Sequence, residues 1–212
     1  MEKKIFHTLF IISLLILILS HTARAGAVHE LVEAPTADMG SEQASLTAEI
    51  TENRGLMEGI YLLDEKVEVG IQIYSGENNN LKPGALVKFL VLEENEGQPA
   101  LAVGLRRKDL YLAASKDLGY NIRGHAGIGD GHYGGIFAGI NKVINPADIT
   151  ITEEDEGGSP DYLNNLPPVN LMAEYLDQEI NLGARFNFYP DLYFDLHLLN
   201  FDTPRAGMSY TF

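Results

Sequence analysis

The stretch EINLGARFNFYPDLYFDLHLL, residues 179–199, decides the fold. Apolar and polar side chains alternate along both halves, and the Pro190-Asp191 step separates them. Because successive side chains of a β-strand point to opposite faces, this pattern predicts two strands joined by a turn, over 179–188 and 191–199. One face is apolar (Ile180, Leu182, Ala184, Phe186, Phe188, Leu192, Phe194, Leu196 and Leu198), and the other is mostly polar (Asn181, Gly183, Arg185, Asn187, Tyr193, Asp195 and His197).

The same period of two returns along the chain from residue 66 onward. The predicted strands are eight to ten residues long. That length suits the ~9–11 residues that cross a bilayer at a tilt better than the ~5–6 usual in soluble sandwiches. We therefore predict an all-β fold, an antiparallel transmembrane β-barrel of about ten strands. They are 66–74, 84–93, 98–106, 109–116, 120–128, 133–142, 169–176, 179–188, 191–199 and 205–212.

Two segments leave the strand count open. Residues 46–63 contain β-like runs without a clear register, so eight or twelve strands remain alternatives. The barrel is expected over 66–212, after a lead-in over 26–65 with short strands. The long acidic connection 143–168 does not suit the short periplasmic turns of barrels, so it forms a plug or short helix, or the count is off by one near 148–152.

The first residues predict export. Lys3 and Lys4 precede an apolar run over 9–19, and Ala23-Arg24-Ala25 follows with small residues two apart. This is the pattern of a cleaved secretory signal peptide over 1–25. The alternative, a retained anchor, is disfavoured because this run of eleven residues covers only about half of a ~30 Å bilayer core as a helix.

Composition excludes several classes of protein. Removal of residues 1–25 leaves 12 basic and 29 acidic residues, a net charge of −17. So acidic a chain is not expected to bind nucleic acid or anionic lipid surfaces. The chain contains no cysteine, which excludes disulfides and a lipidated N-terminal cysteine.

Periodicity alone does not separate a membrane barrel from a soluble periplasmic β-sandwich or a lipocalin-like binder, whose apolar face points inward. Three features favour the outer membrane: the export signal, the aromatic residues near strand ends, and the last strand. There Met208, Tyr210 and Phe212 share one face. A terminal Phe with apolar or aromatic residues two and four positions earlier resembles the assembly signal of outer-membrane barrels, so lipid and the barrel-assembly machinery are expected partners.

The stretch LVKFLVLEENEGQPALAVGLRRKDLYLAASKDLGYNIRGHAGIGDG, residues 86–131, resembles the central segment of YjbH-type proteins. The matching features are Lys88, Glu93-Glu94, the segments 99–105 and 111–116, and the glycine-rich run 127–131. Ala173-Glu174-Tyr175, residues 181–185 and Arg54-Gly55-Leu56 extend the likeness over 54–212. The resemblance implies a short, single-barrel member of an outer-membrane family associated with exopolysaccharide production, and it supplies no catalytic residues. The better-known members are several times longer, and some are lipoproteins.

The polar face contains the candidate functional residues. We expect a lumenal network of Glu68, Lys88, Arg106, Arg123, His125, Glu174, Arg185, Asp195 and His197. Charges confined in a narrow barrel need partners, which favours packed salt bridges, with a polar binding or conduction path as the alternative. Arg185 is expected within ion-pair reach of Glu174 or Asp195.

No enzymatic activity is predicted. A barrel lipase or acyltransferase would need a nucleophile and base at one rim, and no Ser, His and Asp spacing marks a triad. The glycines between 124 and 139 match no phosphate-binding motif, and the acidic run 152–158 lacks the ligand spacing of a calcium loop. We therefore expect no cofactor and no metal.

Overall fold

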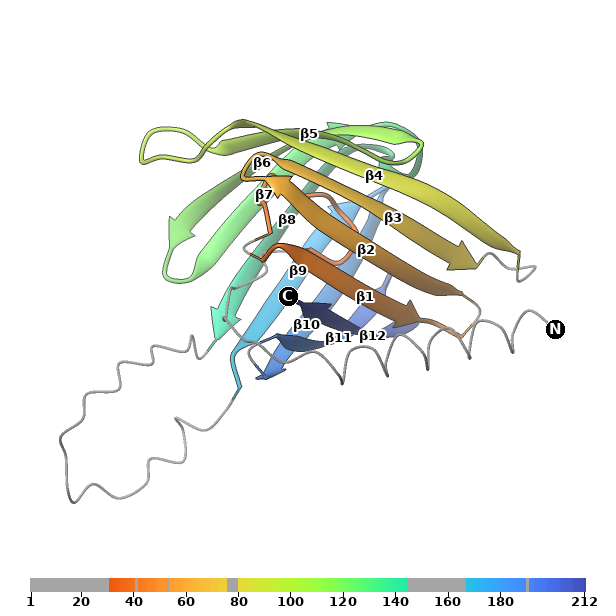
Figure 1. Ribbon diagram of the computed structural model, residues 1–212. Coiled ribbons are helices and arrows are strands. Elements are labelled where there is room, and N and C mark those ends of the chain that lie inside the picture. The colour runs from red at the N-terminus through yellow and green to blue at the C-terminus, as the bar shows by residue number, and fades with distance from the viewer. Residues whose placement is uncertain (1–30, 41, 53, 76–79, 145–166, 190) are drawn as a thin grey trace, which may run out of the picture.

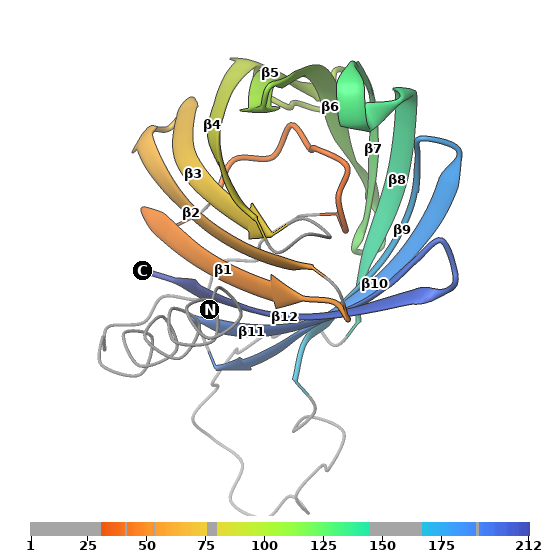
Figure 2. The ribbon, with the colours of Figure 1, turned by 90° about the vertical axis from the view of Figure 1, so that its right-hand side faces the viewer.

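The computed structural model describes residues 31–40, 42–52, 54–75, 80–144, 167–189 and 191–212. Within them, twelve antiparallel strands form a closed barrel in which each strand pairs with its neighbours in sequence and β1 pairs with β12 (Figures 1 and 2). The strands are β1 (Ala44–Ile50), β2 (Gly55–Asp64), β3 (Val67–Ser75), β4 (Leu81–Leu92), β5 (Ala100–Arg107), β6 (Asp109–Gly119), β7 (Ile122–Gly129), β8 (Gly135–Ile144), β9 (Val169–Leu176), β10 (Glu179–Tyr189), β11 (Leu192–Leu199) and β12 (Thr203–Thr211), with one short 3₁₀ turn, η1 (Gly131–Tyr133).

The prediction of a closed antiparallel barrel is confirmed, but about ten strands was wrong. β1 and β2 are full members of the wall, so it begins at Ala44 and not at residue 66. The reason lies in β2, where Leu56 and Ile60 line the interior while Met57 points outward. Apolar side chains on both faces conceal the period of two that marks the other strands.

The barrel has an apolar exterior and a polar interior. Ile71 on the outer face is 69% exposed, whereas Asp195 on the inner face is 0% exposed. Large exposed apolar side chains occur on all strands except β12. Seventeen polar or charged residues of the strands are buried. This is the reverse of a lipocalin-like binder or soluble sandwich, which would hide its apolar face inside. The barrel has the distribution of a lipid-embedded one.

The two ends of the barrel are distinguished by the chain's course. Ala44 and Phe212 exchange two backbone hydrogen bonds of 2.9 Å, so β1 begins where β12 ends. We call this the C-terminal end and the other the η1 end. Asp177 and Gln178, in the turn between β9 and β10, both have positive φ (47° and 66°), as a two-residue type I′ hairpin turn requires.

Residues 31–40 run through the interior of the barrel, and we call them the strap (Figure 2). Leu31 packs in a cluster with Tyr111, Tyr133, Phe137 and Leu176, toward the η1 end. Ala37 packs against Ala100 and Ala102, toward the C-terminal end. The strap therefore narrows the lumen along much of its length before the chain enters β1.

No helix among the described residues is long and apolar enough to cross a membrane. The connection predicted over 143–168 lies outside the described residues at 145–166.

Candidate functional site: the lumen

All nine side chains of the expected lumenal network lie on the interior side of the wall. Four are nearly covered: Glu68, His125, Glu174 and Asp195 are at most 5% exposed. The others form ion pairs with charged side chains or line the cavity of the lumen. The structure divides the nine among several separate groups.

Arg185 and Asp195 form one group, on neighbouring strands β10 and β11. Arg185 donates from Nε to Asp195 Oδ1 at 2.6 Å and from a second guanidinium nitrogen to Oδ2 at 3.2 Å. Ser209 donates to the same carboxylate at 3.1 Å. Such a two-pronged pair fixes direction as well as charge. Of the two acids expected near Arg185, Glu174 and Asp195, it is Asp195 that pairs with it.

A second group joins β2, β3, β4 and β5. Arg106 donates to Glu58 at 2.8 Å, and Gln72 also donates to Glu58. Lys88 pairs with Glu68 at 2.7 Å. Glu58 was missed at the sequence level because it lies in β2, whose register was not recognised.

A third group lies at the η1-side half of β12. Arg205 donates to Glu49 at 3.0 Å, and His197 lies with Nδ1 3.8 Å from the same carboxylate. Both ring nitrogens of His197 are buried without a hydrogen-bond partner among the described residues. Neither Glu49 nor Arg205 was predicted, since Glu49 lies in the unassigned β1 and Arg205 was taken as the first residue of a strand.

His125 lies apart from His197, in a chain of hydrogen-bonded polar side chains. Its Nδ1 lies 2.9 Å from Ser115 Oγ, its Nε2 lies 2.8 Å from Asn141 Oδ1, and Asn141 donates to Asn170 at 3.0 Å. The order Ser, His, Asn is that of a catalytic triad. However, Ser115 is 1% exposed and its Oγ already accepts from the backbone N–H of Ala37 in the strap, so a substrate does not reach it. The group anchors the strap.

Other wall side chains also hold the strap. Glu174 accepts from the backbone N–H groups of Glu33 and Ala34 at 2.9–3.1 Å, and Glu68 accepts from that of Gly40 at 2.5 Å. Asp38 binds Arg123, at 2.7 Å from Nε and 2.5 Å from the second nitrogen, and Glu33 binds Arg205. Sequence reasoning missed the strap because it has no periodicity, although its acids complement the basic side chains of the predicted inner face.

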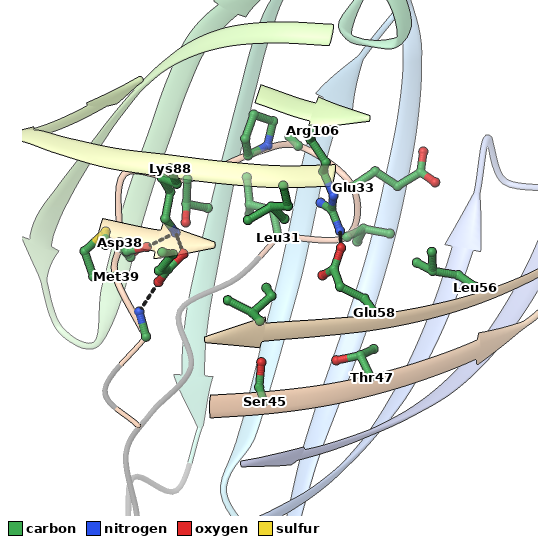
Figure 3. A pocket seen from close by; sticks show the side chains of 18 of the residues that line it. Leu31, Glu33, Asp38, Met39, Ser45, Thr47, Leu56, Glu58, Lys88 and Arg106 are labelled. Carbon is green, nitrogen blue, oxygen red and sulfur yellow. Dashed lines mark hydrogen bonds and ion pairs between the residues drawn. The ribbon is translucent and has the colours of Figure 1, made fainter. Parts of the chain in front are cut away.

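Beside the strap lies a cavity of about 140 Å³ (Figure 3). At the ~30 Å³ that a water molecule takes up in the liquid, it has room for about five water molecules. Its lining includes seven acidic and five Lys or Arg side chains, most of them in the pairs described above. Figure 3 shows Lys88 directed at the strap near Asp38, and Arg106 facing Glu58. The cavity is a charged space bounded on one side by the strap.

Other predicted features lie elsewhere. Met208 and Tyr210 lie in the outward register of β12, opposite Phe194 and Leu192 of β11, although Tyr210 is only 7% exposed. Phe212 follows the last residue of β12, and its ring stacks 5.9 Å from that of Tyr210. No group of three or more His, Asp or Glu side chains that could hold a metal ion occurs in the described part of the chain. The acidic run 152–158 lies outside it.

Comparison with known proteins gives a likeness in fold only. The barrel superimposes on the KdgM porin in complex with disordered oligogalacturonate with a TM-score of 0.50, covering 80% of this chain and 98% of that one at 9% identity. The fold is porin-like. The outer membrane protein Omp33 of Acinetobacter baumannii is also similar, with a TM-score of 0.44 and 10% identity over 81% of this chain and 98% of the other. No family model matches the sequence, and no curated protein matches it.

Proposed function

We propose that this chain is a non-enzymatic outer-membrane channel for small polar solutes, in which the strap narrows the passage. The observation that carries the proposal is the combination of an apolar exterior, exemplified by Ile71, with a polar lumen that contains a cavity of about 140 Å³. Charged side chains that line a pore select its solutes and set its conductance. The lumenal charges described above form such a lining.

Export and insertion complete the proposal. Residues 1–25 direct the chain across the inner membrane as a cleaved signal peptide. The Met208, Tyr210 and Phe212 series is read by the barrel-assembly machinery, which inserts the barrel into outer-membrane lipid. The shared outward register of Met208 and Tyr210 on β12, and the stacking of the Tyr210 and Phe212 rings, support this assignment.

A role with envelope polysaccharide is the finer part of the proposal. The resemblance of residues 54–212 to YjbH-type proteins supports it. The KdgM porin, which has a similar fold, was solved in complex with disordered oligogalacturonate. We propose that the solutes of this channel include short oligosaccharides of the cell envelope.

The test is membrane fractionation followed by conductance in planar bilayers. We expect the protein in the outer-membrane fraction, with a compact form on unheated gels. We also expect a small conductance for the wild type and a larger one for Glu174→Gln, because the neutral amide holds the strap's N–H groups less strongly than a carboxylate. Lys108→Gln, in an exposed turn, is the matched control. A detergent-independent soluble protein, or no conductance from either protein, would refute the proposal.

A further inference from the structure

The strap occupies basic cradles in the wall with its two acidic side chains. Asp38 is held by both prongs of Arg123, while Lys88 donates to its backbone carbonyl at 2.5 Å. His125 Nδ1 lies 3.9 Å from the same carboxylate. This is the donor geometry by which proteins bind a carboxylate from outside.

The second cradle is built in the same way, five residues earlier. Glu33 binds Arg205, and His132 Nε2 of η1 lies 3.5 Å from its carboxylate. The strap contains no basic residue between positions 31 and 40. The strap is therefore a short acidic segment in contact with basic side chains of the wall.

For the backbone of the strap the wall offers acceptors instead of cations. Glu174, Ser115 and Glu68 accept four backbone N–H groups of the strap. The same acceptors suit any chain that has hydrogen-bond donors between its carboxylates. A linear oligosaccharide of uronic acid has this composition, because each unit carries one carboxylate and several hydroxyl donors.

Without the strap each wall cation keeps one carboxylate, and Arg123 and Arg205 each lose the second carboxylate that they hold in this structure. Arg123 would keep only Glu94 at 2.7 Å, Arg205 would keep Glu49 at 3.0 Å, and Lys88 would keep Glu68. The guanidinium donors that Asp38 and Glu33 occupy in this structure would then be available to the carboxylates of an incoming chain. The cavity beside the strap gives such a chain a place to begin binding (Figure 3).

We propose that the strap is an internal mimic of an acidic ligand, and that a short oligosaccharide of uronic acid binds the lumen by displacing it. This inference rests on the proposed channel function and adds its substrate class and its regulation. The oligosaccharide places carboxylates at Arg123 and Arg205, while its hydroxyls donate to Glu174, Ser115 and Glu68. The channel is then opened by its own solute.

The experiment uses the absence of cysteine from the chain. Thr36 is 6% exposed in the strap, so Thr36→Cys creates a single protected thiol in the full-length protein. Its rate of modification by a small thiol reagent is measured in detergent, with and without oligogalacturonate. We expect acceleration of about tenfold or more, because modification follows the population of the displaced strap. Lys108→Cys, in an exposed turn, serves as the matched thiol and should show no change.

Three further arms decide the chemistry of the ligand. The fully methyl-esterified oligogalacturonate keeps its hydroxyls but lacks charge, and should have no effect. Arg123→Gln in the Thr36→Cys protein should weaken the response to oligogalacturonate at least about tenfold, while Arg123→Lys should retain part of it. A compact unheated band on a gel shows that each variant is folded.

Several outcomes would overturn the inference: no acceleration by oligogalacturonate, equal acceleration by the ester, or acceleration only by a synthetic peptide of residues 31–40. The last would assign the lumen to acidic peptides. If the protein conducts in bilayers but oligogalacturonate does not release the strap, the channel stands and this inference falls. If oligogalacturonate releases the strap but no variant conducts, the ligand site stands and the proposed channel function falls.

Discussion

Arg185 and Asp195 are direct neighbours across the β10–β11 pair, and the carboxylate that Arg185 grips has no exposed surface. Nε lies 2.6 Å from Oδ1, and Ser209 takes part of the remaining acceptor capacity. Removal of one partner from such a pair leaves the other charge buried and uncompensated. Removal of Arg185 should therefore lower the stability of the barrel by an amount that unfolding experiments can measure.

We expect Arg185→Ala to lower the free energy of unfolding by about 3–5 kcal/mol, as for other buried pairs that lose one member. Lys108→Ala, in the exposed turn between β5 and β6, should change it by less than about 0.5 kcal/mol. Equilibrium unfolding in detergent or lipid, followed by the heat-modifiable gel shift, measures both. Equal stabilities of the two variants would contradict the role assigned to the pair.

The exterior of the barrel gives a second prediction, which concerns lipid. Ile71 lies near the middle of β3 and is 69% exposed, and Val91 lies near the end of β4 and is 64% exposed. In a bilayer we expect Ile71→Arg to cost about 2–4 kcal/mol and Val91→Arg about 0–1 kcal/mol, because the cost falls toward the interface. Unfolding in liposomes measures the difference. A soluble barrel would tolerate both substitutions equally well.

The face of each strand could be predicted from sequence wherever polar and apolar residues alternate. In β10 and β11 the register of Arg185 and Asp195 follows from counting by two, and the structure places both inside. The alternation is strict there because lipid on one side and a charged lumen on the other impose opposite demands on successive positions.

The strap and β2 could not be predicted in this way. β2 places Leu56 and Ile60 toward the cavity, so its two faces are alike in sequence. The strap is held by bonds from its backbone to side chains far along the chain, such as Glu33 to Glu174, 141 residues apart. Such contacts leave no local pattern. The choice of twelve strands over about ten, and the strap inside the lumen, therefore emerge only from the three-dimensional structure.

Gly127 leads to a third prediction, about close packing inside the wall. A Cβ at this position of β7 would overlap the ring of Phe137 and the backbone carbonyl of Leu112. Phe137 is fully buried and the carbonyl belongs to the β6 ladder, so neither has room to shift. We expect Gly127→Ala to destabilise the barrel by about 1–3 kcal/mol. Gly97→Ala, whose Cβ would meet nothing closer than 3.7 Å, should be tolerated. Unchanged unfolding of the Gly127 variant would show that the wall adjusts more freely than the packing implies.

The connection between β4 and β5 provides a pH-dependent prediction. Burial by itself would raise the pKa of Glu94, but the backbone N–H of Asp117 and the charges of Arg123 and Lys116 outweigh it and hold the pKa below its ordinary value of 4.5. A carboxylate whose pKa is lowered by folding stabilises the folded state above its ordinary pKa, and this contribution is lost as the pH falls through the lowered value. Glu94 is partly exposed, so solvent limits the effect to no more than about 1 kcal/mol.

We therefore expect Glu94→Gln to be slightly less stable than the wild type at pH 7, with the difference disappearing as the pH falls well below 4.5. Unfolding midpoints of the two proteins between neutral and acidic pH, with Glu96→Gln as the exposed control, make the measurement. A difference that grew on acidification would mean that Glu94 is not held by Arg123 in its ionised form.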